Sequence, residues 1–145
     1  MNTPLPLTNG DATCWLADAV LPCGFPSPAE DHVQRRIDLN DILLRHPDAT
    51  FYMRVRGTSM HEAGIDDGDC VIIDRAITAS HGDIVVAVVD GEFTIKRLYR
   101  RDGKVALQPA NAVFSEIVLQ DGQELQVWGV VTWVIKQIHR KSASR

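Results

Sequence analysis

The spacing of apolar residues changes near residue 50, and this change limits the possible folds more than any other feature of the chain. Phe51, Met53 and Val55 alternate there with more polar neighbours. Such alternation predicts a strand with one buried face. Short apolar runs at 70–73 and 84–89 predict two further strands. The second half of the chain is therefore expected to consist mostly of strands.

Two Asp-Gly pairs separate the next strand-like runs. Asp90-Gly91 leads into 92–99, and Asp102-Gly103 leads into 104–108. Asp-Gly suits the two-residue turns that join antiparallel strands, because both residues tolerate positive φ. A β-branched and aromatic run at 126–136 closes the series. We therefore predict a mainly β fold, a compact twisted or barrel-like domain.

The residues before this region have a different pattern. Prolines and small polar residues break any regular period in 1–26, which is typical of an extended arm. Ser27-Pro28-Ala29-Glu30 predicts the start of a helix, with the serine as its cap and the proline in its first turn. Val33 and Ile37 would then share one face of that helix.

Asp38 is expected to cap a second short helix that carries Leu39, Ile42 and Leu43. His46-Pro47 would end it, since the residue before a proline avoids helical geometry. The chain is thus expected to divide into an arm (1–26), a short helical connector (27–49), a β-rich domain (50–138) and a basic flexible tail (139–145).

Composition disfavours several classes of protein. The chain of 145 residues has a net charge of −4, which argues against a protein whose main task is to coat nucleic acid. Cys14, Cys23 and Cys70 are odd in number, and neither they nor the five histidines have metal-ligand spacing. We therefore expect no disulfide framework, metal site or cofactor. No signal peptide or membrane-spanning run is visible, so the cytosol is the expected location.

Ser59 is the first candidate for catalysis. It follows a predicted strand at a glycine-led turn, Gly57-Thr58-Ser59-Met60. A nucleophile at such a turn is exposed, fixed and close to backbone N–H groups that can bind an oxyanion. On this evidence alone, an ordinary turn residue is the commoner explanation.

Lys96 is the second candidate. It lies in the predicted strand 92–99, on the face opposite Phe93 and Ile95. Taken alone, this is the position of a solvated strand residue. A lysine acts as general base for a serine only when it is neutral, and burial in an apolar cleft favours the neutral form. The histidines suggest no alternative pairing with an acid and a nucleophile.

The segment Leu21-Pro22-Cys23-Gly24-Phe25-Pro26 is the third element. Its prolines favour an extended backbone, and Cys23 and Gly24 add little bulk, so a protease cleft would accept it. The plain alternative is a linker with a free thiol. Cys23 has no charged neighbour in the sequence that would activate its thiol, which argues against a nucleophilic role.

Several stretches together resemble one family. Residues 23–29, 36–40, 57–60, 76–85 and 88–96 are similar to UmuD and its plasmid-borne relatives, which belong to the LexA-like serine peptidases. The similarity runs from about Pro22 to Lys136, which is most of the chain. A lone Gly-x-Ser-Met is a weak signal, whereas the cleavable bond, the serine and the lysine in this order are specific.

The resemblance implies a fold and a mechanism. The fold would be the LexA/signal-peptidase-like twisted β domain, preceded by an extended arm with short helical turns. Ser59 would be the nucleophile and Lys96 the general base, with the backbone of Ser59 and of Thr58 or Met60 as the oxyanion hole. The substrate would be the chain's own bond between Cys23 and Gly24.

The resemblance also implies partners. In this family a RecA–single-stranded DNA filament stimulates the cleavage. The shortened homodimer then serves a UmuC-like Y-family polymerase as accessory subunit for translesion synthesis in the SOS response to DNA damage. The resemblance implies no direct sequence-specific DNA binding and no membrane contact.

Three alternatives use the same residues. A LexA-type repressor shares the cleavage chemistry, but the residues before Gly24 are too few for a helix-turn-helix domain. A leader peptidase needs a membrane span, which the sequence lacks. A binding module that does not cleave itself and only assists a polymerase stays open, because a sequence does not show whether Ser59 and Lys96 meet.

Overall fold

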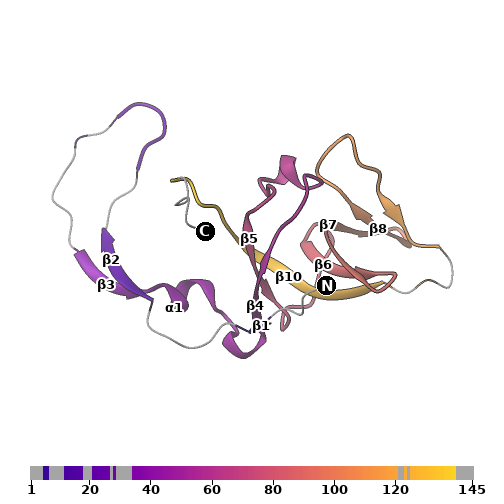
Figure 1. Ribbon diagram of the computed structural model, residues 1–145, viewed down its shortest axis with the longest axis horizontal. Coiled ribbons are helices and arrows are strands. Elements are labelled where there is room, and N and C mark those ends of the chain that lie inside the picture. The colour runs from indigo at the N-terminus through magenta and orange to yellow at the C-terminus, as the bar shows by residue number, and fades with distance from the viewer. Residues whose placement is uncertain are drawn as a thin grey trace, which may run out of the picture.

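The computed structural model describes residues 5–6, 12–17, 21–26, 28, 34–120, 123 and 125–139. Within these residues, one antiparallel sheet of eight strands forms the body (Figure 1). In spatial order its strands are β1 (Leu5–Pro6), β4 (Thr50–Arg54), β5 (Cys70–Asp74), β10 (Gln126–Ile135), β6 (Ile84–Val89), β7 (Glu92–Arg101), β8 (Lys104–Gln108) and β9 (Ile117–Val118). The prediction of a mainly β, twisted domain is confirmed.

Both Asp-Gly pairs form the predicted hairpin turns. Asp90 and Gly91 join β6 to β7 with φ values of 50° and 80°, and Asp102 and Gly103 join β7 to β8 with φ values of 53° and 75°. Positive φ at both central residues matches the right-handed twist of the paired strands. These turns set the register in which Val85 lies opposite Lys96.

The sheet buries side chains on both faces. One cluster contains Ile73 and Val86, and Phe93 and Ile95 pack against it. The other contains Val85, Leu98 and Leu107. Successive residues of β6 therefore enter opposite clusters, as expected for a strand with both faces covered. The predicted alternation along β7 is confirmed, since Phe93 and Leu98 lie in different clusters.

A close approach of β10 to β5 depends on Gly129. A Cβ atom at Gly129 would lie 2.5 Å from Cγ2 of Ile73, which is completely buried. The neighbouring Trp128 packs edge-on against Phe51 and Phe93, with ring centroids 4.9 and 5.4 Å apart. The glycine thus lets two central strands meet without a gap.

The connector before β4 agrees only partly with expectation. Asp38 caps α1 (Leu39–Leu43) by accepting a hydrogen bond from the Asn40 N–H at 2.9 Å, as predicted. The helix ends before the short 3₁₀ helix η1 (Pro47–Ala49). The prediction that Ile37 lies in a helix is wrong.

Ile37 belongs instead to β3 (Gln34–Asp38), which pairs with β2 (Thr13–Ala17) in a separate two-stranded sheet. Cys14 lies opposite Ile37, so a partner strand from the arm, rather than local spacing, decides the conformation.

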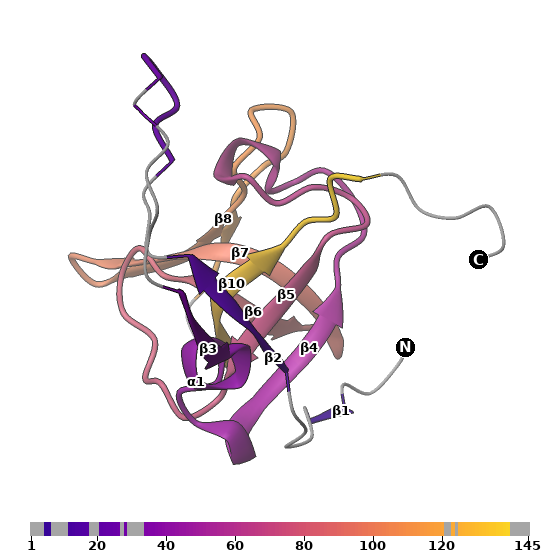
Figure 2. The same ribbon diagram turned by 90° about the vertical axis from the view of Figure 1, so that its left-hand side faces the viewer.

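The β2–β3 ribbon projects from the body, and the segment containing Cys23 and Gly24 lies at its far end (Figures 1 and 2). In both views this segment is well separated from β7. Leu21 is 87% exposed and Phe25 is 94% exposed. The proposed substrate segment is therefore presented to solvent.

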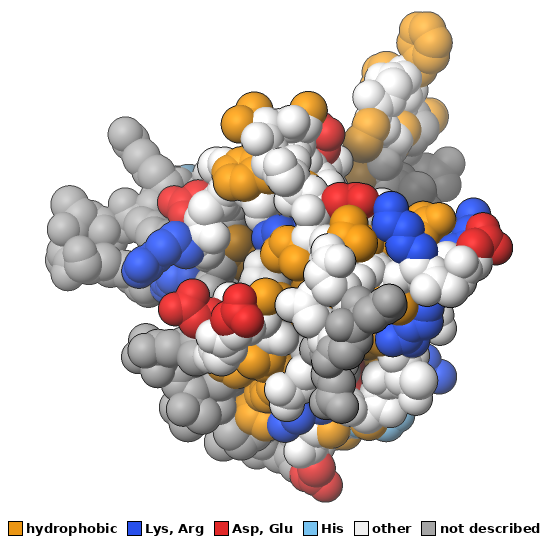
Figure 3. All heavy atoms as spheres, turned by 90° about the vertical axis from the view of Figure 1, so that its right-hand side faces the viewer, with side chains coloured by type: hydrophobic (Ala, Val, Ile, Leu, Met, Phe, Trp, Pro, Cys, Tyr) orange, Lys and Arg blue, Asp and Glu red, His pale blue; other side chains and the backbone are white. Residues whose placement is uncertain are grey.

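Some predictions fall outside the described residues. These are the helix start at residues 27–30, apart from Pro28, the position of Val33, and the tail at 140–145. The division of the chain into four segments stays a prediction. Among the described residues, no helix has the length and apolar character needed to cross a membrane. On the face nearest β7 and β8, apolar and charged side chains are interspersed (Figure 3).

Candidate active site

Ser59 lies on the loop that follows β4. Gly57 turns the chain with φ of 96°, and its N–H donates to Oδ1 of Asp67 at 2.7 Å. Met60 is 2% exposed and anchors the loop in the core next to Ile65. The sequence therefore places a partly exposed serine between a glycine that allows the turn and a methionine that fixes it.

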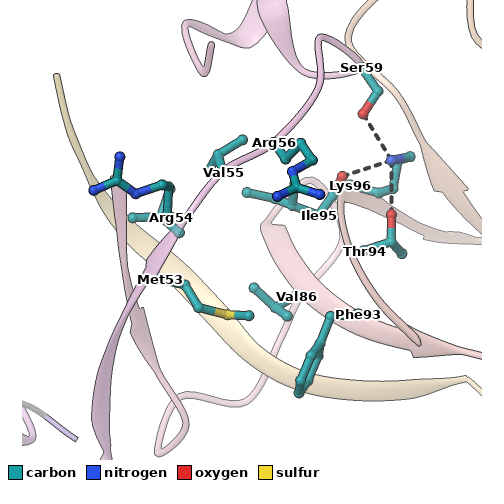
Figure 4. Close-up of a pocket in the computed structure, with 11 residues that line it drawn as sticks. Met53, Arg54, Val55, Arg56, Ser59, Val86, Phe93, Thr94, Ile95 and Lys96 are labelled. Atoms are coloured by element: carbon teal, nitrogen blue, oxygen red, sulfur yellow. Dashed lines mark hydrogen bonds between the residues drawn. The ribbon is translucent and has the colours of Figure 1, made fainter. Parts of the chain in front are cut away.

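Lys96 reaches this serine from β7. Its Nζ donates to Ser59 Oγ at 2.9 Å, to Thr94 Oγ1 at 3.0 Å and to the Ile95 carbonyl at 3.0 Å. Figure 4 shows the three contacts converging on the nitrogen. The structure thus brings together the two side chains that the sequence singles out 37 residues apart.

The surroundings of Lys96 disfavour its charge. Burial lowers the pKa of Lys96 below that of an ordinary lysine. Among the described residues no carboxylate forms an ion pair with it that would restore the charge. The neutral form of Lys96 is therefore more populated at a given pH than that of a lysine on a solvent-exposed strand.

A cleft of about 230 Å³ runs beside the two side chains. Met53, Val86 and Phe93 form its apolar end, away from Ser59 (Figure 4). Arg54 and Arg56 also line it. The cleft can accept an extended, largely apolar segment that ends at the serine, which is the form of the 21–26 sequence.

A second polar cluster fixes the loop after Ser59. Lys136 Nζ donates to Oδ2 of Asp66 at 2.7 Å and to Oδ2 of Asp69 at 2.5 Å, and His61 Nδ1 contacts the other oxygen of Asp66. The hydrogen bond from Lys136 lowers the pKa of Asp66, with a further contribution from His61. This cluster ties the end of β10 to the segment that follows the serine.

Sequence reasoning missed two residues near the site. Thr94 accepts a hydrogen bond from Lys96, and the alternation of β7 already placed both on one face. Asn111 donates through Nδ2 to the Thr58 carbonyl at 2.8 Å. No local signal could have found Asn111, because 53 residues separate the two partners.

The described structure does not bring the predicted cleavage bond to this site. Cys23 and Gly24 are exposed at the end of the ribbon. Within the described ranges, no group of His, Cys, Asp and Glu side chains is arranged to hold a metal ion. Ser59 and Lys96 are residue types that suit nucleophilic and acid–base chemistry.

Comparisons with known proteins identify the family of the chain. The family described as Peptidase S24-like matches residues 18–132. MucA of Salmonella typhimurium is 44% identical over 110 residues, which are 75% of this chain and 75% of MucA. ImpA of Shigella flexneri is 45% identical over 112 residues, which are 77% of this chain and 76% of ImpA.

The LexA repressor of Bordetella petrii is 38% identical over 144 residues, which are 92% of this chain and 63% of the repressor. The resemblance to the UmuD family is thereby confirmed. The chain belongs to the S24 family of serine peptidases, alongside MucA, ImpA and the LexA repressors.

Proposed function

We propose that the protein is a self-cleaving serine peptidase in which Ser59 is the nucleophile and Lys96 the general base. The observation that carries this proposal is the 2.9 Å contact between Lys96 Nζ and Ser59 Oγ beside an apolar cleft. The proposed substrate is the chain's own Cys23–Gly24 bond, supplied by the arm at 1–26 to a peptidase domain at 50–138.

The hydrogen bonds around Lys96 suit a general base. A neutral amine has two N–H donors and one lone pair. The Ile95 carbonyl and the Thr94 hydroxyl oxygen can accept the two N–H groups, which leaves the lone pair facing the hydroxyl of Ser59. Proton transfer from Oγ to Nζ then generates the nucleophile.

The reaction proceeds through an acyl-enzyme. Oγ of Ser59 attacks the Cys23 carbonyl carbon, and the resulting oxyanion is held by the backbone N–H groups of Ser59 and of Thr58 or Met60. Lys96 returns its proton to the amine of Gly24 as the peptide bond breaks. Water then attacks the Cys23 ester and gives one proton to Lys96, which passes it to the departing Ser59 oxygen. Cys23 is released as a carboxylic acid, which loses its proton to solvent to become a carboxylate.

Cleavage requires the arm to approach the cleft. Because the 21–26 segment lies at the far end of the ribbon (Figures 1 and 2), the bond must arrive by movement of the arm or from a second copy of the chain. The UmuD resemblance supports a RecA–single-stranded DNA filament as the stimulus, in the cytoplasm. It also supports a processed homodimer that assists a UmuC-like Y-family polymerase in the SOS response.

Self-cleavage is tested by following product masses at a series of pH values, and separately with RecA, single-stranded DNA and a nucleotide. We expect a new N-terminus at Gly24. Because burial lowers the pKa of Lys96, the rate should rise with pH through that lowered value and level off before the ordinary lysine range.

Ser59→Ala and Lys96→Ala should leave the bond intact, and a matched Lys104→Ala should cleave normally, since Lys104 pairs with Glu116 on an exposed hairpin. A cut that persists in Ser59→Ala would refute the mechanism.

A second candidate function is a polymerase-accessory module that does not cut itself. The exposure of Leu21 and Phe25, remote from the cleft, favours it. A wild-type chain that stays intact under every condition above, and that still binds a UmuC-like polymerase, would select this alternative.

A further inference from the structure

The loop that follows β8 is hydrogen-bonded to the loop that carries Ser59. The Ala110 N–H donates to the Ser59 carbonyl at 2.7 Å, and the Glu62 N–H donates to the Ala110 carbonyl at 2.7 Å. The Asn111 side chain adds a third bond, from Nδ2 to the Thr58 carbonyl at 2.8 Å. The two loops therefore hold each other through both backbone and side-chain atoms.

The Asn111 side chain is fixed within its own turn. Its Oδ1 accepts a hydrogen bond from the Val113 N–H at 3.1 Å, and its carbonyl accepts one from the Phe114 N–H at 3.1 Å. With Oδ1 engaged, the amide group has one orientation, and Nδ2 points at Thr58. A donor held in this way restrains its acceptor more than a freely rotating side chain would.

Restraining a carbonyl also restrains the N–H group of the next residue. A peptide unit is planar and trans, so its C=O and N–H point in opposite directions. The Thr58 carbonyl and the Ser59 N–H belong to one such unit, and the Ser59 carbonyl and the Met60 N–H belong to the next. Asn111 and Ala110 therefore set the directions of the N–H groups of Ser59 and Met60.

These N–H groups are available to a ligand. Within the described part of the chain, the backbone N–H groups of Thr58, Ser59 and Met60 donate no hydrogen bond. The Ser59 N–H is a member of the oxyanion hole whether its companion is Thr58 or Met60. Its direction depends on the Thr58–Ser59 peptide unit. The Thr58 carbonyl of this unit accepts hydrogen bonds from Asn111 Nδ2 at 2.8 Å and from the His61 N–H at 3.1 Å.

We propose that Asn111 is a positioning residue for the oxyanion hole of this peptidase. The inference rests on the function proposed above and adds a residue to it. Asn111 does not touch the reacting atoms. It acts through the Thr58–Ser59 peptide unit, by keeping the Ser59 N–H directed at the position where negative charge develops on the substrate carbonyl.

Asn111→Asp isolates the donor from the rest of the side chain. The aspartate keeps the size of the side chain and the oxygen that accepts the Val113 N–H, but it cannot donate to Thr58. Asn111→Ala removes the donor without adding charge. Gln123→Glu is the matched control, because Gln123 Oε1 accepts the Gln120 N–H in a turn and an acid keeps that acceptor.

Self-cleavage is measured for the full chain over a range of pH. We expect both Asn111 variants to lower the plateau rate about 10- to 100-fold, which is less than the roughly 100- to 1000-fold cost of removing an oxyanion donor, because the Ser59 N–H is kept and only its direction is released. The pH midpoint should not move in Asn111→Ala, because Lys96 stays buried. Gln123→Glu should match the wild type.

A merely structural role predicts a different result. A loosened cleft would hydrate Lys96, raise its pKa and move the midpoint upward, and Asn111→Asp, which keeps the turn, would cleave at the wild-type rate. Either result overturns the inference while leaving the proposed function intact.

Hydrogen exchange of the peptide 57–64 keeps the inference testable if the chain does not cleave itself at all. We expect faster exchange of this peptide in Asn111→Asp and unchanged exchange of 70–74 in β5. Unchanged exchange of 57–64 would contradict the positioning role, whereas an uncut wild type would contradict the proposed function alone.

Discussion

The body of the protein and its arm differ in how they hold their side chains. In the body, Ile73, Leu98 and Leu107 are completely buried between paired strands. Outside the body, the described residues of β2 from the arm and β3 from the connector form a separate two-stranded sheet, and Trp15 is 61% exposed. A two-stranded ribbon without a covered face is marginally stable in water.

This difference separates the proposed catalytic residues from their proposed substrate. Ser59 and Lys96 sit on elements anchored in the core, so their 2.9 Å contact is set by the fold. The bond they are proposed to cut sits on a ribbon that can change position at little cost, because it buries little apolar area. Under the proposed mechanism, the uncut chain would persist until the arm reaches the cleft.

The same substitution in the two regions gives the sharpest contrast. A Cβ at Gly129 would lie 2.5 Å from Cγ2 of Ile73, whereas a Cβ at Gly24 would meet no atom within 4 Å. We expect Gly129→Ala to lower the free energy of unfolding by about 3 kcal/mol, because a packed core resists added volume.

Gly24→Ala, by contrast, should leave the free energy of unfolding unchanged. Urea denaturation of both variants in a Ser59→Ala background, which prevents self-cleavage, measures the difference. Equal effects would mean that the arm is packed like the body.

A smaller effect is expected at Lys96, an ionisable side chain that the body partly buries. Because the pKa of Lys96 is lowered in the folded chain, the unfolded chain binds this proton more tightly, and stability rises with pH between the lowered value and the ordinary lysine pKa. Below that window the folded chain carries the full cost of the charge.

We therefore compare Ser59→Ala with the double variant that also carries Lys96→Met. The double variant should have the larger free energy of unfolding at neutral pH, and this difference should shrink as the pH approaches the ordinary lysine range. Denaturation midpoints at several pH values measure this. Lys104→Met, on an exposed hairpin, should bring no gain. A constant difference at all pH values would show that packing, not charge, is responsible.

The smallest effect is expected in the arm. Trp15 stacks on the guanidinium of Arg36, with 5.1 Å between Cζ and the ring centroid, but little else covers it. Trp15→Ala should change the free energy of unfolding of the whole chain by less than about 0.5 kcal/mol. Hydrogen exchange at 13–17 should nevertheless become faster. A large loss of global stability would mean that the ribbon and the body unfold together.

The sequence was a good guide wherever local chemistry decides the structure. Alternation at Phe51 and Met53 and the turns at Asp90-Gly91 and Asp102-Gly103 predicted strands that the structure contains. The cap at Asp38 was equally local. Ile37 was misassigned because its strand depends on a partner more than twenty residues away, which period and propensity do not reveal.

The candidate site shows the same division. The family resemblance and the glycine-led turn indicated Ser59 and Lys96, and alternation placed Thr94 on the same face as the lysine. Asn111 could not be predicted, because its contact with Thr58 arises only when the loop after β8 folds back onto the loop that carries Ser59. The position of the 21–26 segment is equally a property of the folded ribbon.

The proposed cleavage would change the nature of the pairing between β2 and β3. Hydrolysis between Cys23 and Gly24 would fall in the connection between these strands, so the five register pairs that join Thr13–Ala17 to Gln34–Asp38 would become contacts between two separate molecules. Before the cut the tether supplies a high effective concentration, and afterwards the pairing weakens on dilution. Bond breakage and departure of the fragment would thus be distinct events, and departure would depend on protein concentration even when cleavage occurs within one chain.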